Sequence, residues 1–335
     1  MNRLFLPDTK PVDTSVHGFA RAHGSLVELH ENPLFLTATA PHPDRRTALV
    51  SGGGSGHDPL HAGFVGLGML DAAAPGRIFA SPHNRQVYEA SRAVAREEGV
   101  LHIVKNYTGD RINFGIAAER LRADGVEVQR VLVDDDLATE SHQTATGRRG
   151  TGAALVVEKI LGAAADTGLG LEELARLGGD VVAASRSLAV AGRAQTSSSR
   201  GGEAFSLAED ELEYGVGIHG ERGAATIQRP ALGRITEQMT TELLDGLPDV
   251  GDGVLLLVNG LGGTTPLELY AVHELVSQEL EKRRVEVGAR LVGTFVPALD
   301  MSGFSLTLTS LRPGWLDRWQ APVRTPAFPC TEPRS

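Results

Sequence analysis

The sequence predicts an α/β protein of two domains, the first with a mainly parallel sheet flanked by helices and the second a smaller mixed-sheet α+β domain. Apolar runs alternate with amphipathic segments in the first half, which is typical of βαβ units, and this alternation weakens later. The 335 residues also exceed what a single hydrophobic core usually holds. We therefore expect domains of residues 1–183 and 184–335, with the C-terminal tail able to pack back on the first domain.

The first domain is expected to begin with a helix. Apolar residues recur at helical spacing over residues 14–30, and Asp13 or Thr14 is a suitable cap. Apolar runs then predict strands, and the segments between them predict helices. The expected strands lie within 45–54, 76–81, 100–110 and 126–136, and the expected helices are 58–70, 84–99, 111–125, 151–168 and 170–192.

The second domain is expected to follow a loop. Residues 196–204 are the most loop-like stretch, so they are a plausible place for the change of domain. The proline-rich tail 321–335 is expected to be extended. The elements between them are a strand within 210–223, a helix over 235–247, a strand, loop and helix over 252–285, and candidate strands within 289–299 and 303–311 that can pair with each other.

The composition excludes several classes of protein. A formal net charge of −10 disfavours nucleic acid as a partner, because phosphate binding requires clustered Lys and Arg. Cys330 is the only cysteine, which excludes an internal disulfide and a cysteine-based zinc cluster. The first apolar run is too short for a signal peptide, and no segment reaches the ~20 apolar residues of a membrane span. We therefore expect a cytoplasmic protein that does not bind a membrane.

A glycine cluster, "SGGGSGH", follows an apolar run at residues 51–57. A P-loop would need lysine and then Ser or Thr after Gly56, but the chain has His57 and Asp58 there. The dinucleotide fingerprint Gly-x-Gly-x-x-Gly also fails, because its third glycine falls on His57. What remains is a loop at the carboxyl edge of a sheet, where α/β proteins usually bind ligands. The loop is either a backbone cradle for a small polar ligand or a structural turn.

Two further segments carry reactive side chains. Lys105 and Asp110 lie just beyond an apolar strand, where a carboxylate can accept hydrogen bonds from hydroxyls, act as a base, or simply cap the following helix. His219 lies between Gly217 and Gly220, and a neutral imidazole is a competent nucleophile at neutral pH. The alternative for His219 is a strand-end turn.

Three other polar motifs have simpler interpretations. The run Asp134, Asp135 and Asp136 suggests a metal site, but neighbouring strand residues point to opposite faces, so a solvated strand end is favoured. Arg148 and Arg149 are interpreted as surface residues, with phosphate or partner binding as the weaker alternative. The glycine-rich loop within 258–268 is either an anion site or a tight turn.

These motifs occur together, in this order, in one known family. The segments are "LVSGGGSGHDPLHAGFVGLGML", "VKNYTGD", "VLVDDD", "GRRG", "DELEYGVGIHGE", "LVNGLGGTTPLELY", "DMSGFSLTL" and "APVRTPA". They run from the first third of the chain to its end. The chain resembles the substrate-binding K subunit of dihydroxyacetone kinases.

That resemblance implies roles for specific residues. The family binds its ketone as a covalent hemiaminal on a histidine, which corresponds to His219 here. The loop of Gly54, Ser55, Gly56 and His57 would hold the substrate, with His57 as an acid or base. Lys105 and Asp110 would complete the pocket, with Asp110 on the substrate hydroxyls. A hemiaminal selects a carbonyl compound over a polyol, and capture positions the terminal hydroxyl for phosphoryl transfer.

The resemblance also implies partners. In this family the nucleotide sits in a separate helical L domain or L subunit, so no cofactor is expected on this chain. ATP, or permanently bound ADP recharged by a phosphotransferase relay, is expected on that partner together with Mg²⁺. A homodimer that docks two partner subunits is also implied.

Two departures from the family leave the ketose open. Gln195 and Thr196 stand near the expected Cys-Thr pair, and the segment 244–252 is short. The substrate is therefore dihydroxyacetone or a related short ketose such as erythrulose. The alternative function is a ketose sensor or transcriptional coactivator of the same fold. A nucleotide-binding oxidoreductase is disfavoured by the failed fingerprints.

Overall fold

The computed structural model describes residues 4–139, 147–197, 202–223 and 225–330. They form two compact units, each described here by itself. The N-terminal unit comprises Leu6–Val133, Ala154–Asp180 and Asp317–Ser335, and the C-terminal unit comprises Met1–Phe5, Asp134–Ala153 and Val181–Leu316. This division is more interleaved than one boundary between residues 183 and 184. Of the loop expected over 196–204, residues 198–201 lie outside the described residues.

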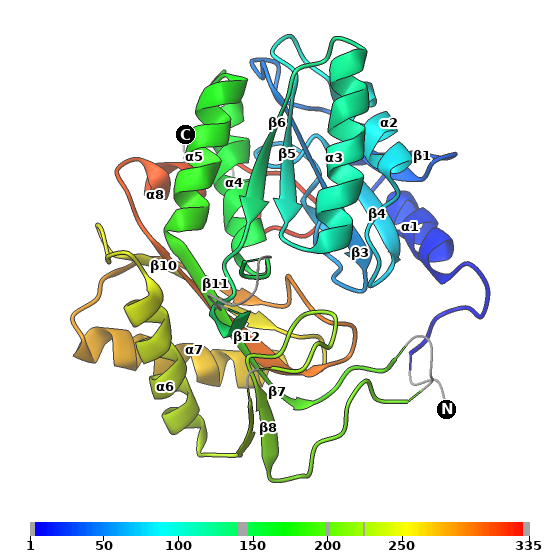
Figure 1. Ribbon diagram of the computed structural model, residues 1–335. Helices are drawn as coiled ribbons and strands as arrows, with labels where there is room; N and C mark the ends of the chain where they lie inside the picture. Colours follow the sequence, from blue (N-terminus) through cyan, green and yellow to red (C-terminus); the bar gives the residue numbers. More distant parts are fainter. Residues whose placement is uncertain (1–3, 140–146, 198–201, 224, 331–335) are drawn as a thin grey trace. The chain divides into compact units, whose positions relative to one another are not determined.

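The N-terminal unit is built on a six-stranded sheet in the order β1-β2-β4-β3-β5-β6 (Figure 1). Strands β4, β3, β5 and β6 are parallel, whereas β1 and β2 extend the sheet antiparallel, as expected for a mainly parallel sheet. The strands are β1 Val27–His30, β2 Phe35–Ala38, β3 Ala48–Ser55, β4 Ala72–Ile78, β5 Val100–Lys105 and β6 Val128–Val133. The helices are α1 Pro11–Ala22, α2 Asn84–Val94, α3 Thr108–Ala123, α4 Ala153–Ala165, α5 Leu171–Ala183 and α8 Trp315–Gln320.

Two predictions for this unit are wrong. Residues 58–70 form no α-helix, only a 3-10 turn at Ala62–Phe64, because Gly66 and Gly68 adopt positive φ that breaks a helical path. The first helix starts at Pro11 after Lys10 and ends at Ala22, and the last four residues of the segment 14–30, Val27–His30, form β1 instead. Apolar spacing alone did not separate these two short elements.

The C-terminal unit is built on a mixed six-stranded sheet in the order β11-β10-β12-β7-β8-β9. The strands are β7 Ser185–Arg193, β8 Glu211–Tyr214, β9 Ala225–Gln228, β10 Val254–Gly260, β11 Val287–Gly293 and β12 Ser302–Ser310, and the helices are α6 Leu232–Gly246 and α7 Pro266–Lys282. The expected helix 170–192 is thus split, because α5 ends at Ala183 and β7 follows. β11 and β12 do not pair with each other; each lies beside β10.

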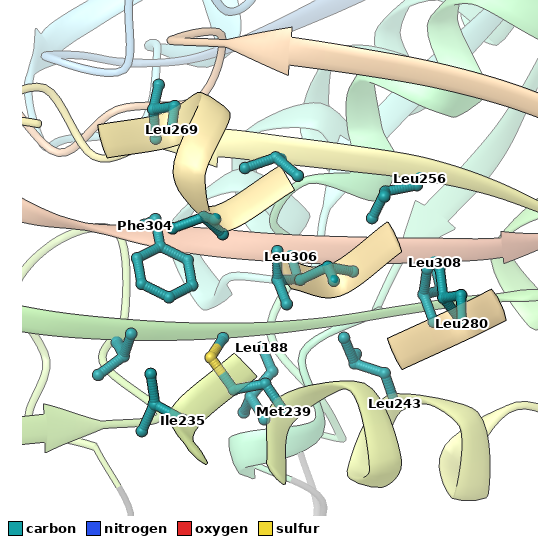
Figure 2. Packing of buried hydrophobic residues seen from close by; sticks show 14 of the residues in the cluster. Leu188, Ile235, Met239, Leu243, Leu256, Leu269, Leu280, Phe304, Leu306 and Leu308 are labelled. Carbon is teal, nitrogen blue, oxygen red and sulfur yellow. The ribbon is translucent and has the colours of Figure 1, made fainter. Parts of the chain in front are cut away.

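Leucine-rich packing holds α6 and α7 on this sheet. Phe304, Leu306 and Leu308 alternate along β12 and point to one face, as the two-residue period of a strand requires (Figure 2). Met239 and Leu243 from α6 meet this face, and both are fully buried. The α/β fold with two domains that the sequence predicted is confirmed. None of the helices within the described ranges combines the length and apolar character that a membrane crossing requires.

Asp135 is an anchor of the C-terminal unit, and its solvated strand-end interpretation is wrong. Its carboxylate is fully buried and accepts hydrogen bonds from the amides of Thr151 and Ala153 at 2.7 and 2.9 Å. The hydroxyls of Thr151 and Ser187 donate to it as well. One carboxylate therefore ties residues 151–153 to β7 within the C-terminal unit.

We expect Asp135→Asn to lower the free energy of unfolding by about 2 kcal/mol or more, because an amide cannot accept from all four donors and leaves some buried and unpaired. Urea unfolding followed by fluorescence measures this. Asp252→Asn, at an exposed turn of the same unit, is the matched control. Equal midpoints for Asp135→Asn and the wild-type chain would contradict the anchoring role.

Candidate functional site

The glycine loop and Lys105 meet at the carboxyl edge of the N-terminal sheet. β3 and β5 are parallel neighbours with Ser51 opposite Ile103, so Gly53, two residues further along β3, comes level with Lys105 at the end of β5. Lys105 is 1% exposed, and its Nζ lies where a side chain at Gly53 would stand. The missing side chain at Gly53 is therefore what admits the ammonium group to the loop.

The loop that leads to His57 is held by its own side chains. Ser55 Oγ donates to the carbonyl of Gly76 at 2.7 Å, and the amide of Gly56 donates to Asp58 at 2.9 Å. The His57 ring is fully buried and packs against the ring of Phe79, with 5.1 Å between centroids. Burial raises the pKa of the Asp58 carboxyl. The imidazole of His57 is thus fixed beside the glycines rather than exposed on a surface turn.

Asp110 lies in the first turn of α3 and is 3% exposed. No side chain caps α3, so the helix-cap interpretation of Asp110 is wrong. Its Oδ1 is buried without a hydrogen-bond partner in the part of the chain that the structure describes. Burial lowers the pKa of Lys105, and the charge of Asp110 opposes that shift. A buried carboxylate oxygen without a partner is the acceptor expected where a hydroxyl ligand binds.

His219 belongs to the C-terminal unit, in the loop after β8, and Glu221 orients it. The amide of His219 donates to Glu221 Oε2 at 2.9 Å, and its ring Nδ1 lies 3.1 Å from Oε1. A carboxylate at Nδ1 favours the tautomer with the proton on Nδ1, which has its lone pair on Nε2. Burial would raise the pKa of Glu221, but the hydrogen bond from His219 and the charges of His219 and Arg149 hold it at about 2.

Arg149 supports the same loop, contrary to the surface interpretation. Its guanidinium pairs with Asp136 at 2.7 Å and donates to the carbonyl of Gly215 at 2.9 Å. Asp136 is 2% exposed, and burial raises its pKa to about 6 against the charge of Arg149. Neither Glu221 nor Arg149 was expected from the sequence as an orienting residue. The only available signal was the placement of a carboxylate two residues after the histidine.

Gln195 also contacts the histidine loop. Its Nε2 donates to the carbonyl of His219 at 3.0 Å, and its carboxamide fills the space where a side chain at Gly220 would stand. Gly220 has φ +80°, so both backbone and space require glycine there. Thr196 donates its amide and hydroxyl to Asp300. The departure at Gln195 and Thr196 therefore lies directly behind His219.

The remaining predicted loops are structural. In 258–268 the amides of Leu261 and Gly263 donate to the carbonyls of Gly303 and Met301, which favours a tight turn over an anion site. In the short segment 244–252, Asp249 pairs with Arg312 through both carboxylate oxygens. No group of three or more His, Cys, Asp or Glu side chains suited to a metal ion occurs within the described ranges.

Comparison with known proteins finds similarity along the whole chain. Residues 17–327 match the family described as the Dak1 domain. The chain is 40% identical over 330 residues to the dihydroxyacetone-binding subunit DhaK of PTS-dependent dihydroxyacetone kinase 1 from Listeria innocua, which covers 98% of this chain and 100% of that protein.

Two solved structures show the same fold. The dihydroxyacetone kinase of C. freundii matches with a TM-score of 0.88 and 32% identity, over 100% of this chain and 62% of that chain. The dihydroxyacetone kinase operon co-activator Dha-DhaQ also matches with a TM-score of 0.88 and 32% identity, over 95% of this chain and 98% of that chain. The fold is therefore shared with an enzyme and with a co-activator.

We expect Glu221→Gln to change how stability depends on pH. The pKa of Glu221 in the folded chain is about 2, below its ordinary value of 4.5. Its stabilising contribution is therefore complete above pH 4.5 and disappears as the pH falls towards 2. Urea midpoints of Glu221→Gln should lie below those of the wild-type chain at neutral pH and approach them between pH 4.5 and pH 2.

The exposed carboxyl of Glu281 supplies the control, since Glu281→Gln should track the wild-type chain at every pH. A constant difference between Glu221→Gln and the wild-type chain down to pH 2 would contradict the assignment.

Proposed function

The chain belongs to the Dak1 domain family, and we propose that it is the ketose-binding subunit of a dihydroxyacetone-type kinase. The whole-length match to a dihydroxyacetone-binding subunit supports this function. The observation that carries it is the pairing of His219 with Glu221, because it selects a histidine tautomer suited to attack a carbonyl carbon. The substrate is dihydroxyacetone or a related short ketose such as erythrulose.

His219 is the nucleophile in this proposal. Its Nε2 forms a bond to C2 of the ketose while the carbonyl π electrons move to oxygen, which takes up a proton. Positive charge develops on the ring, and the ionised Glu221 at Nδ1 stabilises it. Loss of one ring proton then gives the neutral hemiaminal. No atom of the ketose leaves, so the adduct adds the full mass of the sugar.

His57, Lys105 and Asp110 handle the hydroxyl that is phosphorylated. The partnerless Oδ1 of Asp110 accepts a hydrogen bond from a hydroxyl, and Asp110 and His57 take its proton during transfer. Lys105 donates to a sugar oxygen, and the loop of Gly54, Ser55 and Gly56 holds the substrate through its backbone. The burial of all three side chains supports these roles, since water exclusion strengthens such interactions.

The phosphoryl donor is assigned to a partner. An L-type nucleotide-binding subunit carries ATP, or ADP recharged by a phosphotransferase relay, with its Mg²⁺. The name of the Listeria innocua relative, which is PTS-dependent, favours the relay. We also propose that the chain forms a homodimer that docks two such subunits.

The second candidate function is a ketose-sensing co-activator. The similarity to the co-activator structure over 98% of its length favours it. The kinase subunit is preferred because His57 and Asp110, the candidate groups for the hydroxyl proton, are both present and buried in this chain. Capture of a ketose without phosphoryl transfer, with every L-type partner supplied, would favour the co-activator.

We expect incubation with dihydroxyacetone to raise the intact mass of the protein by the mass of one ketose, and His219→Ala to abolish the increase. Because the adduct is reversible, the protein is desalted rapidly and measured by native mass spectrometry, without a reducing agent, so that the adduct stays in place. His273→Ala, on α7 of the same unit, is the control and should retain the adduct. An adduct that survives His219→Ala would rule out the covalent role.

Asp110→Asn should separate capture from transfer. With an L-type partner and its phosphoryl donor, we expect kcat to fall by about 10²-fold or more, because an amide cannot take the hydroxyl proton. The ketose adduct on His219 should persist in the same variant. Asp124→Asn, at the other end of α3, is the matched control. Unchanged turnover for Asp110→Asn would remove Asp110 from the proposed chemistry.

A further inference from the structure

Three titratable side chains are buried in line behind the glycine loop. Lys105 Nζ lies 2.7 Å from His61 Nε2, and His61 Nδ1 lies 2.5 Å from Glu158 Oε1. Glu158 belongs to α4, whose other side chains are apolar except for Lys159. The three groups are 1%, 4% and 0% exposed, respectively. The proposed chemistry uses Lys105 but assigns nothing to His61 or Glu158.

The neighbouring ammonium group fixes the proton on the imidazole. Lys105 Nζ lies 2.7 Å from His61 Nε2, and an ammonium can only donate, so Nε2 is the acceptor. A neutral ring then carries its one proton on Nδ1. That proton points to Glu158 Oε1, the nearer acceptor at 2.5 Å, with Ser51 Oγ at 2.9 Å. An ammonium and a carboxylate are joined through a neutral imidazole.

We propose that His61 and Glu158 are positioning residues that hold Lys105 as a charged donor at the glycine loop. They also receive its proton through a relay of two coupled proton transfers. In the relay, one N–H bond of Lys105 breaks as Nε2–H forms on His61. At the same time Nδ1–H breaks as an O–H bond forms on Glu158. The ring stays neutral, the total number of protons is unchanged, and Lys105 becomes a neutral amine able to accept a proton.

The surroundings support the relay. The charged groups that face Lys105 are Asp110 from α3 and Glu158 from α4, and His57 faces His61. Burial lowers the pKa of His61 far below its usual value, aided by the charges of Lys105 and His57, so the ring stays neutral. Burial raises the pKa of Glu158 to about 8 against the charge of Lys105, so this carboxylate can hold a proton near neutral pH.

The inference rests on the proposed function only for the use of Lys105, and the relay itself can be measured without substrate. The chain has four lysines, Lys10, Lys105, Lys159 and Lys282, so side-chain NMR of lysine-labelled protein can follow each of them. The wild-type chain and Glu158→Gln are titrated over pH, with Lys105→Arg used to assign the Lys105 signal. Glu158→Asp keeps the carboxylate, and Glu98→Gln, in the same unit, is the matched control.

We expect Lys105 in Glu158→Gln to lose its proton at a pH lower by about one unit or more, because the carboxylate that favours its charged form is gone. Glu158→Asp should restore most of the wild-type behaviour, and Glu98→Gln should leave it unchanged. The same Lys105 midpoint in Glu158→Gln and the wild-type chain would overturn the proposal. So would an equal shift in Glu98→Gln.

A second measurement covers the case in which Glu158→Gln does not fold. Nitrogen NMR of histidine-labelled wild-type chain should show His61 neutral with its proton on Nδ1 from pH 5 to 8. A charged His61, or a proton on Nε2 while Lys105 is still charged, would overturn the relay. This measurement needs no substitution in the network.

Activity then separates the relay from the proposed function. If the chain forms the ketose adduct and transfers phosphate, the pH profile of kcat/KM in Glu158→Gln should move towards lower pH together with Lys105. A shifted Lys105 in a chain that binds no ketose would leave the relay standing and remove the proposed function. If the chain forms the adduct and turns over but the Lys105 midpoint does not shift in Glu158→Gln, the proposed function stands and the relay is removed.

Discussion

A fully buried ammonium group is the constraint on which the N-terminal unit depends. Taking a lysine charge out of water costs several kcal/mol unless opposite charge and hydrogen bonds replace the solvent. Lys105 meets that condition through His61 and Glu158 on one side and the charge of Asp110 on the other. This explains why β3 has no side chain at Gly53 and why a glutamate interrupts the apolar helix α4. The packing of β3, β5 and α4 therefore brings these groups together around one charge.

In the C-terminal unit, polar contacts hold an imidazole in place. His219 is held at its amide and its ring by the two oxygens of Glu221, and its carbonyl is held by Gln195. The positive charge of Arg149 helps to lower the pKa of Glu221. Arg149 is itself held by an ion pair with Asp136. Two layers of polar contacts thus fix a residue on a loop, where backbone alone would leave it mobile. Arg149 belongs to the motif "GRRG", which therefore supports His219 from a distant part of the sequence.

The sequence predicted much of the fold and offered candidate reactive side chains, but not the residues that support them. The runs that form β3 and β5 and the histidine among glycines are local signals, and they were enough to single out His57, Lys105 and His219 as candidates. Glu158 lies 97 residues from His61 in the chain, so no local pattern joins them. Asp135 was misjudged because aspartate is rarely buried, and its donors from Thr151 and Ser187 become visible only in three dimensions. The helix expected at 58–70 failed because glycine geometry overrode apolar spacing.

Capture of a ketose and transfer of phosphate make different demands on one fold. In the proposed function, capture needs a nucleophile with its tautomer fixed, and the pair of His219 and Glu221 is the candidate for it. Transfer also needs a group that takes the hydroxyl proton and a donor that holds a sugar oxygen. Asp110 and Lys105, with the buried groups behind Lys105, meet this second need. Glu158 offsets the buried charge of Lys105 in either function, but the relay that we propose through it would serve transfer and not capture. The network behind the glycine loop, rather than the fold, is therefore the feature that argues for an enzyme subunit.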